Sequence, residues 1–135
     1  MDQELELLDA AVHLLRRRYV PSAHVVATAL RSTSGRIHLG LHLGANVARA
    51  SICAEAVALG IAVMADDGAV VSGVTVHHHP DTPGWKVVAP CGVCRELLFA
   101  HAPGMMILLA LAREDGLGLR GVHVDDLLPD KFTRE

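Results

Sequence analysis

Three cysteines in this 135-residue sequence could hold one metal ion. Cys91 and Cys94 are separated by two residues, and Cys53 lies earlier in the chain. Zn²⁺ prefers four ligands in a tetrahedron and binds thiolate sulfur at about 2.3 Å. Two cysteines with this spacing can reach one ion from the first turn of a helix, and the third can complete the set from another helix. The fourth position then stays open for water, which is typical of a catalytic rather than a structural zinc site.

Glu55 follows Cys53 by two residues, an offset that turns its carboxylate away from the sulfur but keeps it near the metal. A carboxylate in that place could take a proton from water on the metal and pass it to a substrate nitrogen. Helix N-termini suit both cysteine fragments, because their positive end stabilises thiolates. Cys53-Ala54-Glu55 followed by Pro90-Cys91-Gly92-Val93-Cys94 matches the signature of zinc deaminases. The sequence therefore predicts a zinc site with Glu55 as the catalytic residue.

The elements that must position these residues follow from hydrophobic periodicity and turn residues. Apolar residues recur at helical spacing before Pro21, and each cysteine fragment opens a further helix, the second directly after Pro90. We expect helices over 3–18, 53–64 and 91–101, strands over 23–30, 36–43, 69–77, 105–111 and 119–124, a loop over 79–89, and a short helix before the C-terminal tail.

Helices that alternate with strands indicate an α/β fold, with one sheet and helices on its faces. The length of the chain fits a single domain over residues 1–135. The connector at 112–118 is too short for a crossover helix, and a parallel pair needs about a dozen residues or more. We therefore expect a five-stranded mixed sheet whose last two strands are antiparallel.

The composition argues against several classes of function. The formal net charge is −3, and the longest basic run, Arg16-Arg17-Arg18, ends an expected helix, where cations complement the helix dipole. Nucleic-acid binders usually present a larger basic face. The acidic start Met1-Asp2-Gln3-Glu4 is unlike a secretory signal, and no apolar run reaches the ~20 residues of a membrane span. We expect a cytoplasmic protein that binds neither nucleic acid nor membrane.

Four further segments carry a family resemblance that runs from Tyr19 to Phe132. They are Tyr19-Val20-Pro21-Ser22, Gly44-Ala45-Asn46-Val47, the run from Pro90 to Leu98, and Leu127-Leu128-Pro129-Asp130-Lys131-Phe132. In these segments the sequence resembles the small homo-oligomeric cytidine deaminases and is similar to the blasticidin S deaminase type. The resemblance implies a three-layer α-β-α fold and a tetramer or dimer with shared pockets.

The resemblance also implies a reaction and a set of substrate contacts. A cytosine ring would lose its exocyclic amine as ammonia and become a uracil, with Zn²⁺ as the cofactor. The backbone around Ala54 would bind the base, and Asn46 would bind the sugar. His24 stands where the family has an aromatic residue near the base, and Phe132 would reach the site of a neighbouring subunit.

Two departures from the family pattern concern the substrate and the charge of the metal site. Ala48 replaces the glutamate that grips the ribose, and losing such a bond costs ~1.5–3 kcal/mol of binding. The stretch before Cys53 is also short, so a nucleoside antibiotic, a modified cytosine or a purine-like amine remain alternatives to cytidine and deoxycytidine. Ala56 replaces an arginine that offsets the thiolate charge, and Arg95 or Arg49 could take over that task.

Other interpretations of the sequence stay open. A structural zinc or thiol protein would share the cysteines but would have no use for Glu55, and a nucleic-acid editing domain would carry a helix in the last connector. Residues 77–79 are consecutive histidines whose side chains would point to opposite faces of a strand, so we expect a strand end rather than a metal site. Trp85 could cap the pocket, cover a subunit contact or simply pack.

Overall fold

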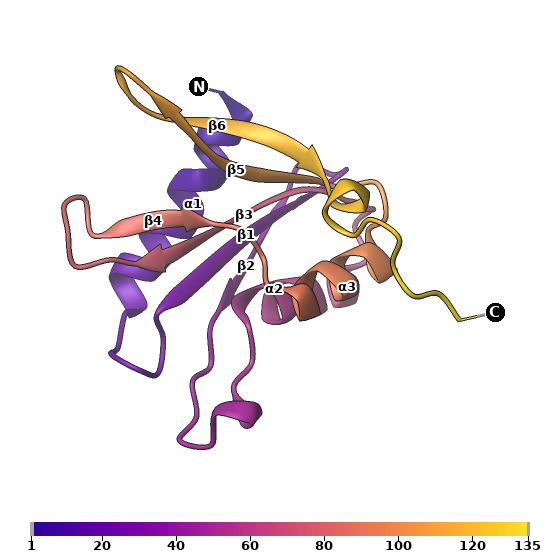
Figure 1. Ribbon diagram of the computed structural model, residues 1–135, viewed down its shortest axis with the longest axis horizontal. Coiled ribbons are helices and arrows are strands. Elements are labelled where there is room, and N and C mark those ends of the chain that lie inside the picture. The colour runs from indigo at the N-terminus through magenta and orange to yellow at the C-terminus, as the bar shows by residue number, and fades with distance from the viewer. Residues whose placement is uncertain (1, 135) are drawn as a thin grey trace.

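One mixed sheet forms the centre of the computed structural model, which describes residues 2–134 (Figure 1). The elements are α1 (Gln3–Arg18), β1 (Val26–Ser32), β2 (Ile37–Leu41), the 3-10 turn η1 (Ala48–Ala50), α2 (Ala54–Ala65), β3 (Val70–His78), β4 (Trp85–Val88), α3 (Gly92–His101), β5 (Met106–Arg113), β6 (Gly116–His123) and the 3-10 turn η2 (Val124–Leu127). Their order follows the expected alternation of helices and strands.

The strands run in the order β2-β1-β3-β5-β6, and β4 pairs with β3 outside this path. Only β3 and β5 are parallel among these pairs, so the sheet is mixed. β5 and β6 are antiparallel from Met106↔His123 to Arg113↔Gly116. The tight connection between them confirms the expectation that rested on the short connector.

The strand β4 corrects the prediction that residues 79–89 form only a loop. Trp85, Val87 and Val88 favour a pleated strand because they are aromatic or β-branched. β5 pairs only with Ser72 and Gly73 of β3, so the rest of that edge is free and β4 pairs there, from Thr75↔Val88 to His78↔Trp85. The nearby prolines and glycine concealed this long-range pairing in the sequence.

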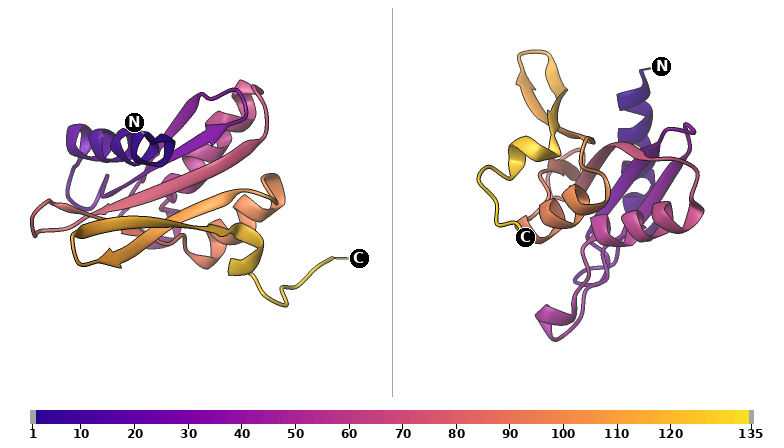
Figure 2. Two further views of the ribbon diagram at one scale, coloured as in Figure 1. Left: turned by 90° about the horizontal axis from the view of Figure 1, so that it is seen from above. Right: turned by 90° about the vertical axis from the view of Figure 1, so that its right-hand side faces the viewer.

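Helices cover both faces of the sheet and make three layers (Figure 2). α1 packs on one face, where its leucines meet Ala27 and Ala29 of β1 in one core cluster. α2 and α3 lie on the other face, where Leu30, Leu59 and Leu98 belong to a second cluster. Because side chains alternate along β1, Thr28 points to the face of α2 and α3.

Gly40 lets α2 approach the sheet closely. A side chain at this position of β2 would collide with the Ala54 carbonyl and the Ala58 backbone. Ala54 and Ala58 are fully buried on the facing side of the helix, so small residues on both elements bring the two backbones together. This contact fixes the first turn of α2, which carries Glu55, above β1 and β2.

Candidate active site

The three cysteines meet where the N-termini of α2 and α3 converge. Cys53 is the N-cap of α2, Cys91 is the N-cap of α3, and Cys94 lies in the first turn of α3. Their sulfur atoms all lie within 4.8 Å of one another, and the Sγ atoms of Cys53 and Cys91 are 3.8 Å apart. Among residues 2–134 this is the one group of three or more His, Cys, Asp or Glu side chains close enough to share a metal ion.

The geometry of the sulfur cluster fits a tetrahedral metal ion. Two sulfurs bound at about 2.3 Å with a tetrahedral angle lie roughly 3.8 Å apart, which is the separation of Cys53 and Cys91. All three cysteines are free, and this separation is far longer than a disulfide bond. Cys94 is buried whereas Cys91 is exposed, so one side of the cluster stays accessible. The donor set could therefore hold a soft metal ion with an open position.

The ionisation of the thiols shows what a cation would supply. Burial would raise the pKa of Cys91, but hydrogen bonds from the Cys94 amide and thiol and from Cys53 outweigh it, and this pKa falls below its usual value. Burial raises the pKa of Cys53, and burial together with the charge of Glu55 raises the pKa of Cys94. A bound dication would hold the thiols of Cys53 and Cys94, whose pKa values are raised, in the ionised form.

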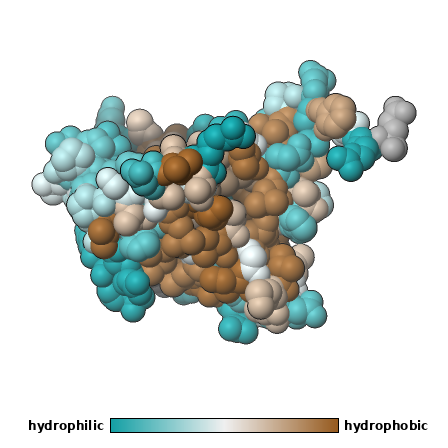
Figure 3. Space-filling model, turned by 90° about the horizontal axis from the view of Figure 1, so that it is seen from below, coloured by the Kyte–Doolittle hydropathy of each residue, from teal (hydrophilic) through white to brown (hydrophobic). Residues whose placement is uncertain are grey.

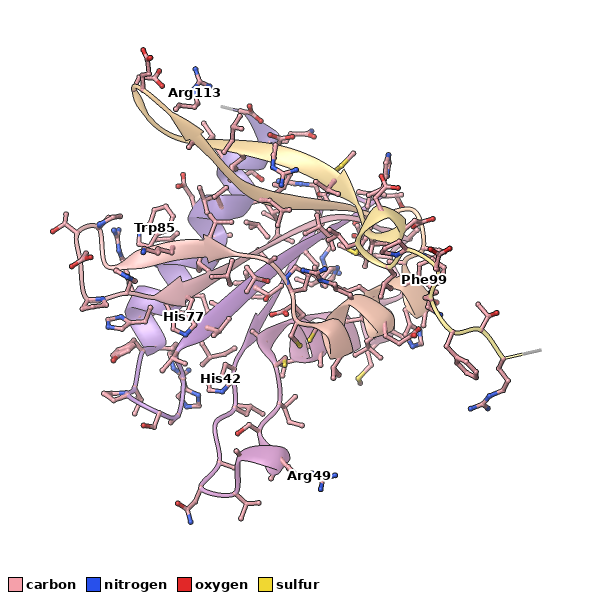
Figure 4. All side chains as sticks on the ribbon, in the orientation of Figure 1. His42, Arg49, His77, Trp85, Phe99 and Arg113 are labelled. Carbon is pink, nitrogen blue, oxygen red and sulfur yellow. The ribbon has the colours of Figure 1, made fainter. Side chains whose placement is uncertain are left out.

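Neither arginine proposed to offset the thiolate charge forms a hydrogen bond to a sulfur among the described residues. Arg95 donates from Nε to the Pro90 carbonyl at 2.8 Å and from Nη1 to the Leu127 carbonyl at 3.3 Å. Arg49 is exposed on η1, at the tip of the loop that projects after β2 and well away from His42 (Figure 4). Arg95 therefore links, through its two hydrogen bonds, the backbone directly before Cys91 to the backbone of η2.

A pocket opens beside the sulfur cluster. Its lining residues come from β1, the end of β2, both helix N-termini, β3 and β4: Val26, His42, Cys53, Ala54, Glu55, Thr75, Val88, Ala89 and Cys91. Glu55 is only 6% exposed, and its Oε1 accepts a hydrogen bond from Thr28 Oγ1 at 3.2 Å. A carboxylate and two of the three thiols, those of Cys53 and Cys91, thus share one pocket between apolar walls.

The predicted site residues divide into two groups. Ala54, Glu55, Cys53 and Cys91 line the pocket, and Cys94 is buried beside them in the sulfur cluster, whereas His24, Asn46 and Phe132 do not line it. Asn46 is exposed in the loop after β2 and lines a separate hollow with Pro21 and neighbours of both. Phe132 is 82% exposed on the C-terminal tail, which projects from the body of the molecule (Figure 1).

His42 lines the pocket and was missed by sequence reasoning. It directly follows β2, and its backbone N–H bonds to Val26 of β1. The Val25 N–H donates to His42 Nδ1 at 3.3 Å, so the neutral ring carries its proton on Nε2. Burial lowers the pKa of His42, and the nearby His24 and His77 lower it further. The available signal was strand alternation, which puts His42 on the same face as Gly40.

His24 supports His42 from behind. Its Nδ1 lies 2.8 Å from the His42 carbonyl, a contact in which the ring N–H donates to that oxygen. A second ring, His77, partners Val26 in the register of β1 and β3 and so shares the pocket face of the sheet. Figure 4 shows His42 and His77 near one another at this end of the sheet. His24, which we predicted to lie in the pocket wall, therefore does not line the pocket itself but holds the backbone of His42, which does.

No family model matches the chain. The curated protein described as blasticidin-S deaminase from Bacillus cereus is 33% identical over 135 residues, which cover 98% of this chain and 94% of that protein. The chain belongs to the cytidine deaminase-like family. Its members act on a carbon–nitrogen bond, and this chain is therefore a deaminase-type enzyme.

Solved structures of cytidine deaminases match the deaminase over nearly all of its length. The enzyme from Burkholderia pseudomallei has a TM-score of 0.75 at 26% identity, with 98% of this chain and 100% of that chain covered. The enzyme from Mycobacterium tuberculosis has a TM-score of 0.75 at 25% identity, with 99% and 100% covered. These matches confirm the predicted family and the α/β fold with its mixed sheet.

Trp85 and the three consecutive histidines take no part in the pocket. Trp85 packs against the core cluster under α1, on the face of the sheet opposite the cysteines. His77 and His78 end β3, and the His78 ring stacks on Tyr19 with 3.9 Å between centroids.

In residues 2–134 of the deaminase, no helix is both long and apolar enough to cross a membrane.

Proposed function

We propose that this deaminase is a zinc-dependent hydrolase that removes the exocyclic amine of a cytosine-type nucleoside and releases ammonia. The observation that carries the proposal is the placement of a buried carboxylate, Glu55, in the pocket that Cys53 and Cys91 of the three-cysteine cluster also line. A structural zinc or thiol site has no use for a proton carrier beside its ligands. When bound, Zn²⁺ would supply Lewis-acid activation of a water molecule.

Each residue of the pocket then has a definite task. Cys53, Cys91 and Cys94 would hold the metal, and Glu55 would move protons at its carboxylate. It would take one proton from the attacking water and deliver it to the ring nitrogen, and then take the second proton from the oxygen now bound to C4 and deliver it to the leaving amine. C4 of the base gains the oxygen of water, and the C4–N4 bond breaks with loss of ammonia.

The apolar walls and the helix backbone would orient the ring. Val26 and Val88 come from neighbouring parts of the sheet and flank the pocket, so a flat ring can pack against them while bulk water is excluded. Ala54 is fully buried at the first position of α2 and is one of the residues that line the pocket. We propose that this backbone binds the polar edge of the base.

Two substrate classes compete for the part beyond the base. Cytidine and deoxycytidine are the first candidates within the family. Blasticidin S, a nucleoside antibiotic, is the second candidate, because the curated relative with 33% identity is described as a deaminase of that compound. Ala48 in place of a ribose-binding glutamate and the exposed position of Asn46 also favour a substituent other than plain ribose.

The test is ammonia release by purified, zinc-loaded protein from cytidine, deoxycytidine and blasticidin S, measured side by side. A kcat/KM for blasticidin S at least about tenfold above that for cytidine would assign the antibiotic class, since tenfold corresponds to about 1.4 kcal/mol of difference in transition-state stabilisation. The reverse ratio would assign cytidine. Absence of ammonia from all three, with one zinc per chain, would refute the cytosine-type substrate.

His42 should contribute to substrate binding more than to chemistry. Its Nε2–H is free of protein partners among the described residues, so it can donate to an acceptor on the substrate. We expect His42→Ala to raise KM about tenfold with kcat nearly unchanged, the effect of one neutral hydrogen bond. The matched control is His13→Ala, an exposed histidine on α1. A drop in kcat with constant KM would instead place His42 in the chemical step.

Self-association is the arrangement that we propose for the deaminase in solution. The outer surface of α2 carries no charged side chain, since its one acidic residue, Glu55, is buried. Ile61, Val63 and Met64 are 47%, 54% and 86% exposed there, and Figure 3 shows the broad apolar surface on this side of the molecule. Monomeric proteins rarely expose such a continuous patch.

A neighbouring copy would also help to complete the pocket. One chain forms a cavity of about 170 Å³ beside the cysteines, whereas small-molecule sites usually measure roughly 300–1,000 Å³. The exposed Phe132 is available to a neighbour, in line with its predicted role. Sedimentation analysis should give a mass of two or four times 14.3 kDa. A mass of one chain, or no change after Met64→Glu, would refute this interface.

A further inference from the structure

Two buried threonines lie directly beneath the catalytic carboxylate. Thr28 of β1 and Thr75 of β3 are partners in the strand register, and both side chains point to the face of α2. They are 1% and 5% exposed, with apolar neighbours such as Leu98 and Met105 around them. Hydroxyl groups in such surroundings need hydrogen-bond partners, because an unpaired buried one costs free energy.

The hydroxyls and the carboxylate form a chain with a fixed direction. Thr28 Oγ1 is 2.7 Å from Thr75 Oγ1 and 3.2 Å from Glu55 Oε1. An ionised carboxylate only accepts, and each hydroxyl has one proton to donate. Since Thr28 donates to Oε1, the bond between the two threonines must come from Thr75. The order is therefore Thr75 to Thr28 to Glu55 Oε1.

This chain removes the remaining freedom of the Glu55 side chain. Gly40 already brings the first turn of α2 close to the sheet, which leaves mainly the torsions of the glutamate. Thr28 is β-branched and stiff, so its hydroxyl is a fixed donor. Oε1 is held by this bond. The other oxygen, Oε2, has no protein hydrogen bond among the described residues, and it is not one of the fully buried polar atoms that lack a partner, so part of its surface is accessible. Oε2 is therefore the oxygen that can be reached from the pocket.

We propose that Thr28, supported by Thr75, is a positioning residue that holds Glu55 with Oε2 turned to the substrate. The inference rests on the proposed role of Glu55 as the proton carrier. The carried proton binds Oε2 and leaves from Oε2, while Oε1 stays an acceptor in both states. Neither threonine gains or loses a proton in the cycle, so the chain keeps its direction and acts only through geometry.

The matched variants separate positioning from packing. Thr28→Val keeps the shape of the side chain and removes the hydroxyl, and Thr28→Ser keeps the hydroxyl. We expect Thr28→Val to lower kcat by roughly tenfold to a hundredfold with KM and zinc content unchanged, because misplacing a reacting group by about 1 Å has that effect. Thr28→Ser should restore most of the loss. Thr75→Val should lower kcat only by about twofold to threefold, since the donor to Glu55 remains.

The double variant Thr28→Val with Thr75→Val guards against a folding defect. Replacing both partners of a buried hydrogen bond by apolar groups of similar shape is nearly neutral for stability. Glu55 Oε1 lacks its donor in both variants, and the double variant leaves no threonine hydroxyl unpaired, so we expect its unfolding temperature to be no lower than that of Thr28→Val while kcat stays as low as in Thr28→Val. A kcat of Thr28→Val within twofold of wild type, or a Thr28→Ser variant as slow as Thr28→Val, would overturn the proposal.

A spectroscopic readout keeps this test independent of the substrate. The difference between the infrared spectra of the wild type and Glu55→Gln isolates the carboxylate band of Glu55. The same difference, taken in each Thr28 variant, should show a shifted band in Thr28→Val, where Oε1 has lost its donor, and an unshifted band in Thr28→Ser. If the wild type turns over none of the nucleosides, the proposed substrate class fails and this band alone decides the positioning role. An unshifted band in Thr28→Val would refute it.

Discussion

Glu55→Gln should abolish measurable deamination while the cysteine cluster keeps its metal. The amide has almost the same shape as the carboxylate and can still accept the hydrogen bond from Thr28, so the buried site loses no partner. It cannot take up a proton at neutral pH, and general acid–base catalysis supplies about 10²–10⁴-fold of rate. We expect kcat to fall by at least that range, with zinc content near one per chain and an unchanged unfolding temperature.

The matched control for this variant is Glu96→Gln on α3. Glu96 is exposed and forms an ion pair with Lys131 at 3.2 Å, at the surface of the molecule. The same chemical change there should leave kcat and KM at the wild-type values. A Glu55→Gln enzyme that keeps more than a tenth of the wild-type kcat would show that another group moves the proton.

The placement of the cysteines and of Glu55 could be predicted from the sequence because its determinants are local. Cys91 and Cys94 share one helical turn, and Glu55 shares another with Cys53. Each fragment fixes its own geometry within a few residues, so the only long-range assumption was that the two helix N-termini meet. The sulfur cluster within 4.8 Å bears out that assumption.

The walls of the pocket depend on pairing between distant strands, and here the sequence carried less information. His42 reaches the pocket because β2 ends at Leu41, whereas the motif around Asn46 directed attention to a loop four residues further on. Strand β4 supplies Val88 only because β3 extends beyond β5. Register of this kind is decided by the whole sheet, not by the local residues.

The contact between Thr28 and Thr75 could not be predicted from the sequence either, because it also depends on strand register. Thr28 and Thr75 are 47 residues apart in sequence, and each is an ordinary strand residue taken alone. Only the register of β1 on β3, together with the close approach of α2 at Gly40, places a donor under Glu55. A position that looked like one more buried strand residue thereby becomes part of the site.

Cys94→Ala should remove the metal and with it the activity, while leaving the fold intact. Its sulfur is the most buried of the three, at 1% exposure, so no water can take its place without entering the core. Two thiols leave the tetrahedral ligand set incomplete. Loss of a residue that only supports a metal ligand lowers metal affinity by up to about a hundredfold, so we expect loss of this ligand to lower zinc affinity by more than about a hundredfold. The core under α2 and α3 does not depend on the thiol, since it consists of aliphatic side chains such as Leu59 and Leu98.

Metal content, thiol titration and activity together check this prediction. Chelation of the wild type should expose three titratable thiols, and zinc should restore protection and turnover together, because the sequence contains three cysteines in all. Val93→Ala on the same helical turn is the control, since Val93 is 75% exposed and should leave zinc binding unchanged. A Cys94→Ala protein that still binds one zinc with wild-type kcat would contradict the three-cysteine site. Loss of zinc with retained turnover would contradict metal-dependent chemistry altogether, because Glu55 would then act on water without a Lewis acid.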